Sequence, residues 1–138
     1  LEVELAVCEA WSQEGDLQPV DPSLAGPSRR ILVRNRRILL HCRSEEGTPF
    51  AILLVGAFNV GRILFSFDPT LGGKRIQNGL RHYAPPCRLA AGEEMGRFEL
   101  GSSVVLFAPP DRRPLLPPGE PCRAREPLLA APAQETEN

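Results

Sequence analysis

The sequence predicts a mainly β protein that ends in an irregular, proline-rich tail. Short apolar segments rich in β-branched and aromatic residues alternate with clusters of Gly, Pro, Asp and Ser, which is the usual pattern of strands and turns. No window of useful length shows the 3.6-residue apolar period of a helix. Eight of the fifteen prolines follow Phe107, and proline has no amide hydrogen for a strand ladder. We therefore expect a compact β domain over residues 1–108 and a tail over 109–138 that is either an extended surface arm or disordered.

Strands are expected over 1–10, Arg36–Cys42, Phe50–Val55, Asn59–Phe67 and Ser103–Phe107. Alternating apolar and acidic residues make the first of these a half-buried strand. The second and third flank a turn-forming segment and should pair as a hairpin. Gly56 and Gly61 should mark bulges or close approaches of the backbone.

Composition excludes several classes of function. Sixteen basic and seventeen acidic residues leave a net charge of −1, which argues against nucleic acid as a partner. The four cysteines are far apart and there are two histidines, so no metal site is expected. Without a signal segment or a dense cysteine framework, the thiols are expected to be reduced in a cytoplasmic setting. No apolar run reaches the ~18 residues of a membrane span. Because the chain starts at Leu1, it is expected to be part of a longer protein.

A Gly-Ser-Ser sequence, Gly101 to Ser103, interrupts the apolar run between Gly96 and Pro110. One interpretation is a glycine bulge between strands. The other is self-cleavage, in which the Ser102 hydroxyl attacks the Gly101 carbonyl and converts the amide into an ester. β-Elimination would then leave dehydroalanine, which hydrolyses to a pyruvoyl group and ammonia. Glycine favours the required backbone bend, but the residues alone leave both interpretations open.

The surrounding segment, A-G-E-E-M-G-R-F-E-L-G-S-S, resembles the cleavage region of the phosphatidylserine decarboxylase proenzyme family. The matching positions are Gly92, Glu94, Met95, Gly96, Phe98, Gly101, Ser102 and Ser103. Three upstream segments are similar to family motifs in the same order: E-G-D-L-Q-P-V from Glu14, V-R-N-R-R-I-L-L-H-C from Val33 and I-L-L-V-G-A-F-N-V-G-R-I from Ile52.

The resemblance implies a barrel-sandwich-like β domain that cuts itself between Gly101 and Ser102. Ser102 would become the pyruvoyl cofactor at the head of the α chain, and the β chain would end at Gly101. The implied reaction converts phosphatidylserine to phosphatidylethanolamine and CO2. The implied location is peripheral, at an anionic membrane surface: the cytoplasmic face of the inner membrane, or the mitochondrial inner membrane in a eukaryote. A homo-oligomer is left open.

The chain departs from the family pattern in lacking its upstream aspartate and histidine segment. His82, expected in a loop, is the alternative proton donor, whereas His41 is expected to be a structural, hydrogen-bonded residue of a strand. The arginine group (Arg29, Arg30, Arg34, Arg36 and Arg37) is interpreted as a solvated strand edge, with attraction to anionic lipid as the functional alternative. A truncated, non-catalytic β domain that binds lipid or a partner is the alternative function.

Overall fold

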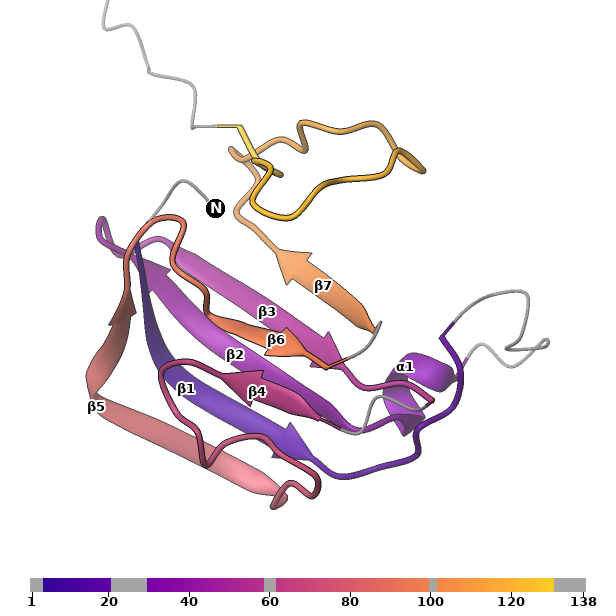
Figure 1. Cartoon of the computed structure of the whole chain (residues 1–138). Coiled ribbons are helices and arrows are strands. Elements are labelled where there is room, and N and C mark those ends of the chain that lie inside the picture. Colours follow the sequence, from indigo (N-terminus) through magenta and orange to yellow (C-terminus); the bar gives the residue numbers. More distant parts are fainter. Residues whose placement is uncertain (1–3, 21–29, 59–61, 100–101, 131–138) are drawn as a thin grey trace, which may run out of the picture.

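The structure, a computed structural model, describes residues 4–20, 30–58, 62–99 and 102–130. One antiparallel sheet has the strand order β5-β1-β2-β3-β7, made of β1 (Leu5–Gln13), β2 (Arg37–Ser44), β3 (Pro49–Val55), β5 (Gly79–Leu89) and β7 (Ser103–Phe107). A two-stranded ribbon of β4 (Ile63–Phe65) and β6 (Gly96–Phe98) lies over one face of that sheet (Figure 1). A one-turn helix, α1 (Ile31–Arg34), precedes β2. The predicted mainly β fold is confirmed, as a compact arrangement of two sheets in which the larger sheet is open and has β5 and β7 at its edges.

The hydrophobic core lies between the large sheet and the β4–β6 ribbon. Val7, Ile38, Leu40 and Ile63 are fully buried there, and the alternate side chains of β2 point to the opposite face. Each such aliphatic side chain contributes about 1.5–3 kcal/mol on burial. A β-bulge between Val7 and Glu9 shifts the register of β1 against both of its neighbours. Because of the bulge, two partly exposed residues, in place of one, separate the core residues Val7 and Ala10 of β1.

Four of the five expected strands are found: β1, β2 and β3 have shifted ends, and β7 has the predicted bounds. The second and third expected strands pair as the predicted hairpin, β2–β3. The strand expected over 1–10 begins and ends later, as β1. Of the strand expected over Asn59–Phe67, β4 covers three residues, while residues 59–61, including Gly61, lie outside the described residues.

The prediction that His82 lies in a loop was wrong, because His82 is in β5, an eleven-residue strand. Pro85 and Pro86 made this segment resemble a turn. Proline is tolerated in a strand at the edge of a sheet, where the missing amide hydrogen would face away from the neighbouring strand. β5 lies at such an edge and pairs with β1 alone among the described strands.

The described part of the tail, residues 109–130, folds back on itself at the surface and is not fully extended. The amide of Leu115 donates a hydrogen bond to the Leu128 carbonyl at 2.9 Å, and that of Ala130 donates to Arg113 at 2.8 Å. Leu129 packs against the core. Residues 131–138 lie outside the described residues. No helix in the described ranges is long and apolar enough to cross a membrane.

Candidate functional site

Ser102 lies immediately before β7, at one end of the large sheet. Ser103, the next residue, pairs with Val55 at the end of β3, so Ser102 lies near the turn that begins at Gly56. The Ser102 Oγ is buried, and no described residue forms a hydrogen bond with it. A buried hydroxyl without a partner is costly and rare. Gly101, on the other side of the predicted cleavage bond, lies outside the described residues.

The turn beside Ser102 is held by a buried asparagine. The Asn35 amide nitrogen donates to the carbonyls of Gly56 and Gln18, both at 2.8 Å. Its amide oxygen accepts from the Gln18 backbone nitrogen at 3.1 Å. Asn35 is fully buried, so these hydrogen bonds replace those that water would make. One side chain thus joins the segments that follow β1 and β3.

Glycine is required where the E-G-D-L segment meets the helix end. A Cβ on Gly15 would lie 2.3 Å from the Arg34 carbonyl oxygen, which is closer than any side chain can approach. The backbones are joined there by hydrogen bonds from Asp16 N to Arg34 O and from Arg36 N to Asp16 O, at 2.9 and 2.8 Å. Two of the segments that resemble family motifs therefore pack directly against each other.

Arg36 corrects the interpretation of the arginine group as a solvated edge. It is 5% exposed, and its Nε donates to Glu14 Oε1 at 2.7 Å. The other Glu14 oxygen accepts from the Ile76 amide at 2.8 Å. Burial alone would raise the pKa of Glu14, but the hydrogen bonds from Ile76 and Arg36 lower it overall. Arg37 also has a structural contact, since its guanidinium lies 5.5 Å from the centre of the Trp11 ring.

The E-M-G segment has a similar structural role on the other side of the core. A Cβ on Gly96 would lie 2.5 Å from the Leu64 carbonyl oxygen, so glycine allows β6 to approach β4. The Met95 carbonyl accepts from the Ser66 amide at 3.0 Å. These contacts fix the start of the strand that leads toward Ser102.

His82 and Ser102 are not brought together. His82 is on β5 and Ser102 adjoins β7, at opposite edges of the five-stranded sheet (Figure 1). Four strand spacings of about 4.8 Å separate these edges by roughly 19 Å.

Both histidines instead contact Glu9, which lies between them on β1. His41 Nδ1 is 3.1 Å from Glu9 Oε2, and His82 Nδ1 is 3.0 Å from Glu9 Oε1. The hydrogen bond with His41 is the main cause that lowers the pKa of Glu9. His41 therefore lies in a strand with a hydrogen-bonding partner, as expected. This cluster could not be predicted from the sequence, because it depends on the register of three strands.

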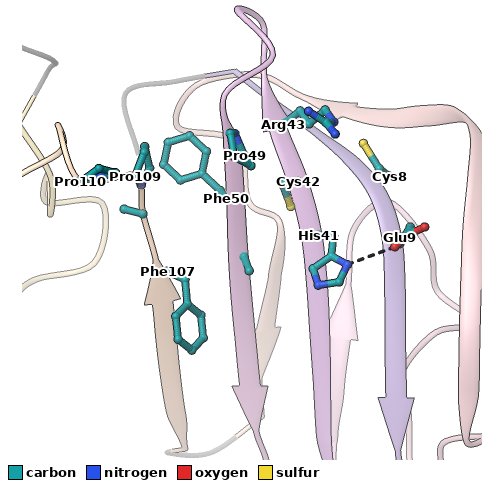
Figure 2. A pocket seen from close by; sticks show the side chains of 12 residues that line it. Cys8, Glu9, His41, Cys42, Arg43, Pro49, Phe50, Phe107, Pro109 and Pro110 are labelled. Atoms are coloured by element: carbon teal, nitrogen blue, oxygen red, sulfur yellow. Dashed lines mark hydrogen bonds and ion pairs between the residues drawn. The ribbon is translucent and has the colours of Figure 1, made fainter.

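A hollow of about 580 Å³ lies beside this cluster, on the face of the sheet away from the β4–β6 ribbon. Figure 2 shows His41 and Glu9 at one side of it and Phe107 at the other. Phe107 is the last residue of β7, whereas Ser102 precedes the first. The hollow and the serine are therefore at opposite ends of that strand.

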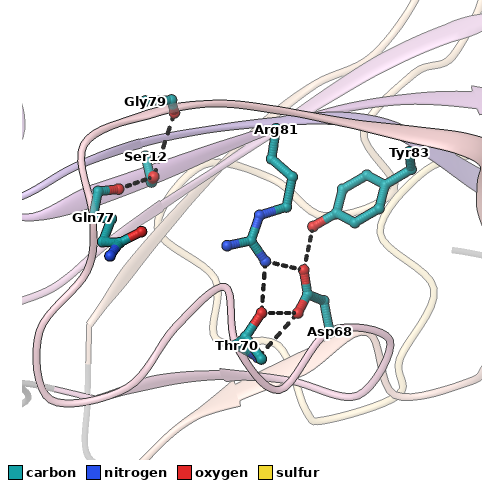
Figure 3. Close-up of polar contacts among 7 residues, drawn as sticks. All are labelled: Ser12, Asp68, Thr70, Gln77, Gly79, Arg81 and Tyr83. Carbon is teal, nitrogen blue, oxygen red and sulfur yellow. Dashed lines mark hydrogen bonds and ion pairs between the residues drawn. The ribbon is translucent and has the colours of Figure 1, made fainter.

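A second polar cluster, around Asp68, was not predicted from the sequence (Figure 3). The Asp68 carboxylate accepts hydrogen bonds from the Tyr83 hydroxyl at 2.8 Å, from the Thr70 hydroxyl at 2.7 Å, and from Arg81. Burial would raise the pKa of Asp68, but these donors outweigh burial and lower it to about 2. These hydrogen bonds connect the loop after β4, which carries Asp68, to Arg81 and Tyr83 of β5.

Metal-ligand geometry is not found in the described part of the chain, where no group of His, Cys, Asp and Glu side chains is arranged to hold an ion. Burial raises the pKa of the Cys42 thiol to about 12, which makes it a poor nucleophile. Ser102 stays the nucleophile that the sequence predicts.

Fold and site together define a small antiparallel β protein in which a serine immediately precedes an edge strand and its buried hydroxyl has no hydrogen-bond partner among the described residues. The profile of the family described as phosphatidylserine decarboxylase matches residues 3–130. The chain belongs to this family.

Curated relatives agree with this assignment. The phosphatidylserine decarboxylase proenzyme of Helicobacter pylori (strain Shi470) is 32% identical over 106 residues, which cover 75% of this chain and 40% of the relative. The proenzyme of Chromobacterium violaceum is 38% identical and covers 69% of this chain and 35% of its own length. The proenzyme of Variovorax paradoxus is 39% identical, and the match covers 79% of this chain and 39% of the relative. The chain thus spans about two fifths of the length of these relatives.

Proposed function

We propose that this chain is the cofactor-forming portion of a phosphatidylserine decarboxylase, which cuts itself between Gly101 and Ser102. The observation that carries the proposal is the Ser102 Oγ, which is buried without a partner among the described residues. A reacting serine needs a neighbouring base as its hydrogen-bond partner, and no described residue occupies that position. The unpartnered hydroxyl and the family membership therefore support the same assignment.

In the proposed reaction, the Ser102 oxygen bonds to the Gly101 carbonyl carbon as the amide C–N bond breaks, and the product is an ester. Elimination releases the Gly101 carboxylate and leaves dehydroalanine at position 102. Water then converts this residue to a pyruvoyl group and releases ammonia. A pyruvoyl ketone supplies an electron sink for loss of CO2 from an amino acid head group.

In the proposed reaction, the described residues position Ser102. The hydrogen bonds of Asn35 fix the Gly56 turn next to the Ser102 hydroxyl, and the β3–β7 ladder fixes the residue that follows it. A fixed geometry matters because a neutral serine is a weak nucleophile that depends on a neighbouring base. Because the structure separates His82 from Ser102, we propose that the base comes from elsewhere than His82. Phosphatidylserine as substrate and peripheral attachment to an anionic membrane are parts of the same proposal.

The test expresses the protein at the full length that its gene encodes and measures intact masses. We expect an α fragment that starts with a pyruvoyl group at position 102, and reduction with borohydride should add two hydrogens to it. Ser102→Ala should remain uncut and inactive, because the nucleophile is gone. Ser102→Cys should cut but form little pyruvoyl, because a thiol can perform the acyl shift. Decarboxylation without any cleavage at position 102 would refute the proposal, and an uncut, inactive protein would favour the non-catalytic alternative.

A further inference from the structure

Three large apolar side chains are exposed at the end of the sheet where Ser102 lies. Leu32 and Val33 of α1 are 43% and 63% exposed, and Phe58, after β3, is 61% exposed. Single exposed apolar residues are common, but a group of them marks a binding surface. We call this group, together with Arg30 and Arg34, the α1 patch.

The fold brings the two segments of the α1 patch together. The Gly56 amide donates to the Arg36 carbonyl at 2.8 Å, and the Asn35 side chain holds the Gly56 carbonyl. Phe58 follows Gly56 by two residues, and α1 ends directly before Asn35. Figure 1 shows α1 beside the loop that follows β3, at the same end of the sheet as the start of β7. The patch therefore adjoins the Ser102 site.

The charge of the α1 patch favours an anionic partner. Arg30 forms no ion pair within the described ranges, and the Arg34–Asp16 pair, at 3.1 Å, has both side chains about half exposed. An exposed pair of this kind holds its arginine weakly. Apolar side chains flanked by arginines, whose stems can lie along apolar surface, are the combination that binds the interface of an anionic bilayer.

We propose that the α1 patch docks on the surface of an anionic lipid bilayer, with Leu32, Val33 and Phe58 among the lipid head groups. The choice of a bilayer over an acidic protein rests on the proposed function, because a lipid substrate must reach Ser102 from a membrane. Docking at this patch would hold the Ser102 end of the sheet against the bilayer. Each arginine near the surface should strengthen binding about fivefold.

The test measures cosedimentation of the Ser102→Ala chain with vesicles of phosphatidylcholine and phosphatidylglycerol, and with phosphatidylcholine alone. We expect binding to the anionic vesicles that weakens as salt rises, because salt screens the arginines. The variant Leu32→Ser/Val33→Ser/Phe58→Ser should bind at least tenfold more weakly. A matched control, Leu80→Ser/Leu115→Ser/Leu128→Ser, changes three leucines that are 52%, 51% and 39% exposed elsewhere, and should bind like the parent.

A second measurement locates the contact without removing apolar residues. In a Trp11→Phe background, which removes the native tryptophan, the fluorescence of Val33→Trp should be quenched by brominated lipids in anionic vesicles, whereas that of Leu115→Trp should not. Equal losses in the two triple variants, equal quenching at both positions, or no binding to anionic vesicles would overturn the proposal. Because Ser102→Ala removes cleavage from the assay, failure of docking is distinguishable from failure of the proposed reaction.

Discussion

Replacing Asn35 with alanine should destabilise the protein far more than replacing an exposed asparagine. The truncated side chain would leave the Gly56 carbonyl without a partner in a buried position, at a cost of about 2 kcal/mol. The two lost hydrogen bonds with Gln18 are partly buried and should add about 1 kcal/mol together, because water can replace them in part. Asn78→Ala is the control: this side chain accepts one exposed hydrogen bond, from the Glu14 amide, and its loss should cost under about 1 kcal/mol.

The assay is urea denaturation of both variants in the Ser102→Ala background, which removes the proposed nucleophile. With a denaturant slope of about 2 kcal/mol/M, a loss of about 3 kcal/mol lowers the midpoint by about 1.5 M urea. The slope itself should not change. Equal midpoints for the Asn35 and Asn78 variants would show that the Gly56 turn is held by something other than Asn35, and the argument for a fixed Ser102 environment would fail.

Three further outcomes are expected. Asp68→Asn should lower the free energy of unfolding by on the order of 2 kcal/mol at about pH 6. The folded pKa of Asp68, about 2, lies below the ordinary 3.8, so this stabilisation is complete above about pH 4 and disappears as pH falls through 2. Denaturation of Asp68→Asn and of the exposed control Asp111→Asn at several pH values would reveal the difference. Iodoacetamide should modify the exposed Cys122 rapidly and the buried Cys42 only on unfolding, and equal rates by mass spectrometry would contradict the burial argument. Ser103→Ala should slow the proposed cleavage only a few-fold, since the nucleophile of the proposed reaction is the Ser102 hydroxyl; a loss as complete as that of Ser102→Ala would assign Ser103 a direct role.

Local sequence patterns predicted the strands that are marked by their own composition. β2, β3 and β7 are short runs of branched or apolar residues with turn formers between them. β5 was missed because it depends on position in the sheet. Pro85 and Pro86 disfavour a strand in general, but an edge strand tolerates them.

The candidate site stays a prediction, and only its local features could be recognised from the sequence. Ser102 stands out through its glycine neighbour and its apolar surroundings, which are local features. The burial of Asn35 and Arg36 is not local, since each is satisfied by segments about twenty residues away along the chain. The contact of His82 with Glu9 depends on strand register after a β-bulge. A pattern of single residues cannot predict such a contact.

The edge position of β7 has a consequence for the protein after processing. The proposed cleavage before Ser102 would place Ser102 and the residues after it in a separate chain. The five-residue ladder with β3 and the packing of Leu106, Ala108 and Leu129 on the core would hold that chain to the rest of the protein. Folding of the mature protein then becomes an association of two polypeptides, and its melting temperature should rise with protein concentration, as for any complex governed by mass action. The uncut Ser102→Ala chain should melt at one temperature whatever its concentration. Dilution would thus destabilise the cleaved protein and would leave the stability of the uncut chain unchanged.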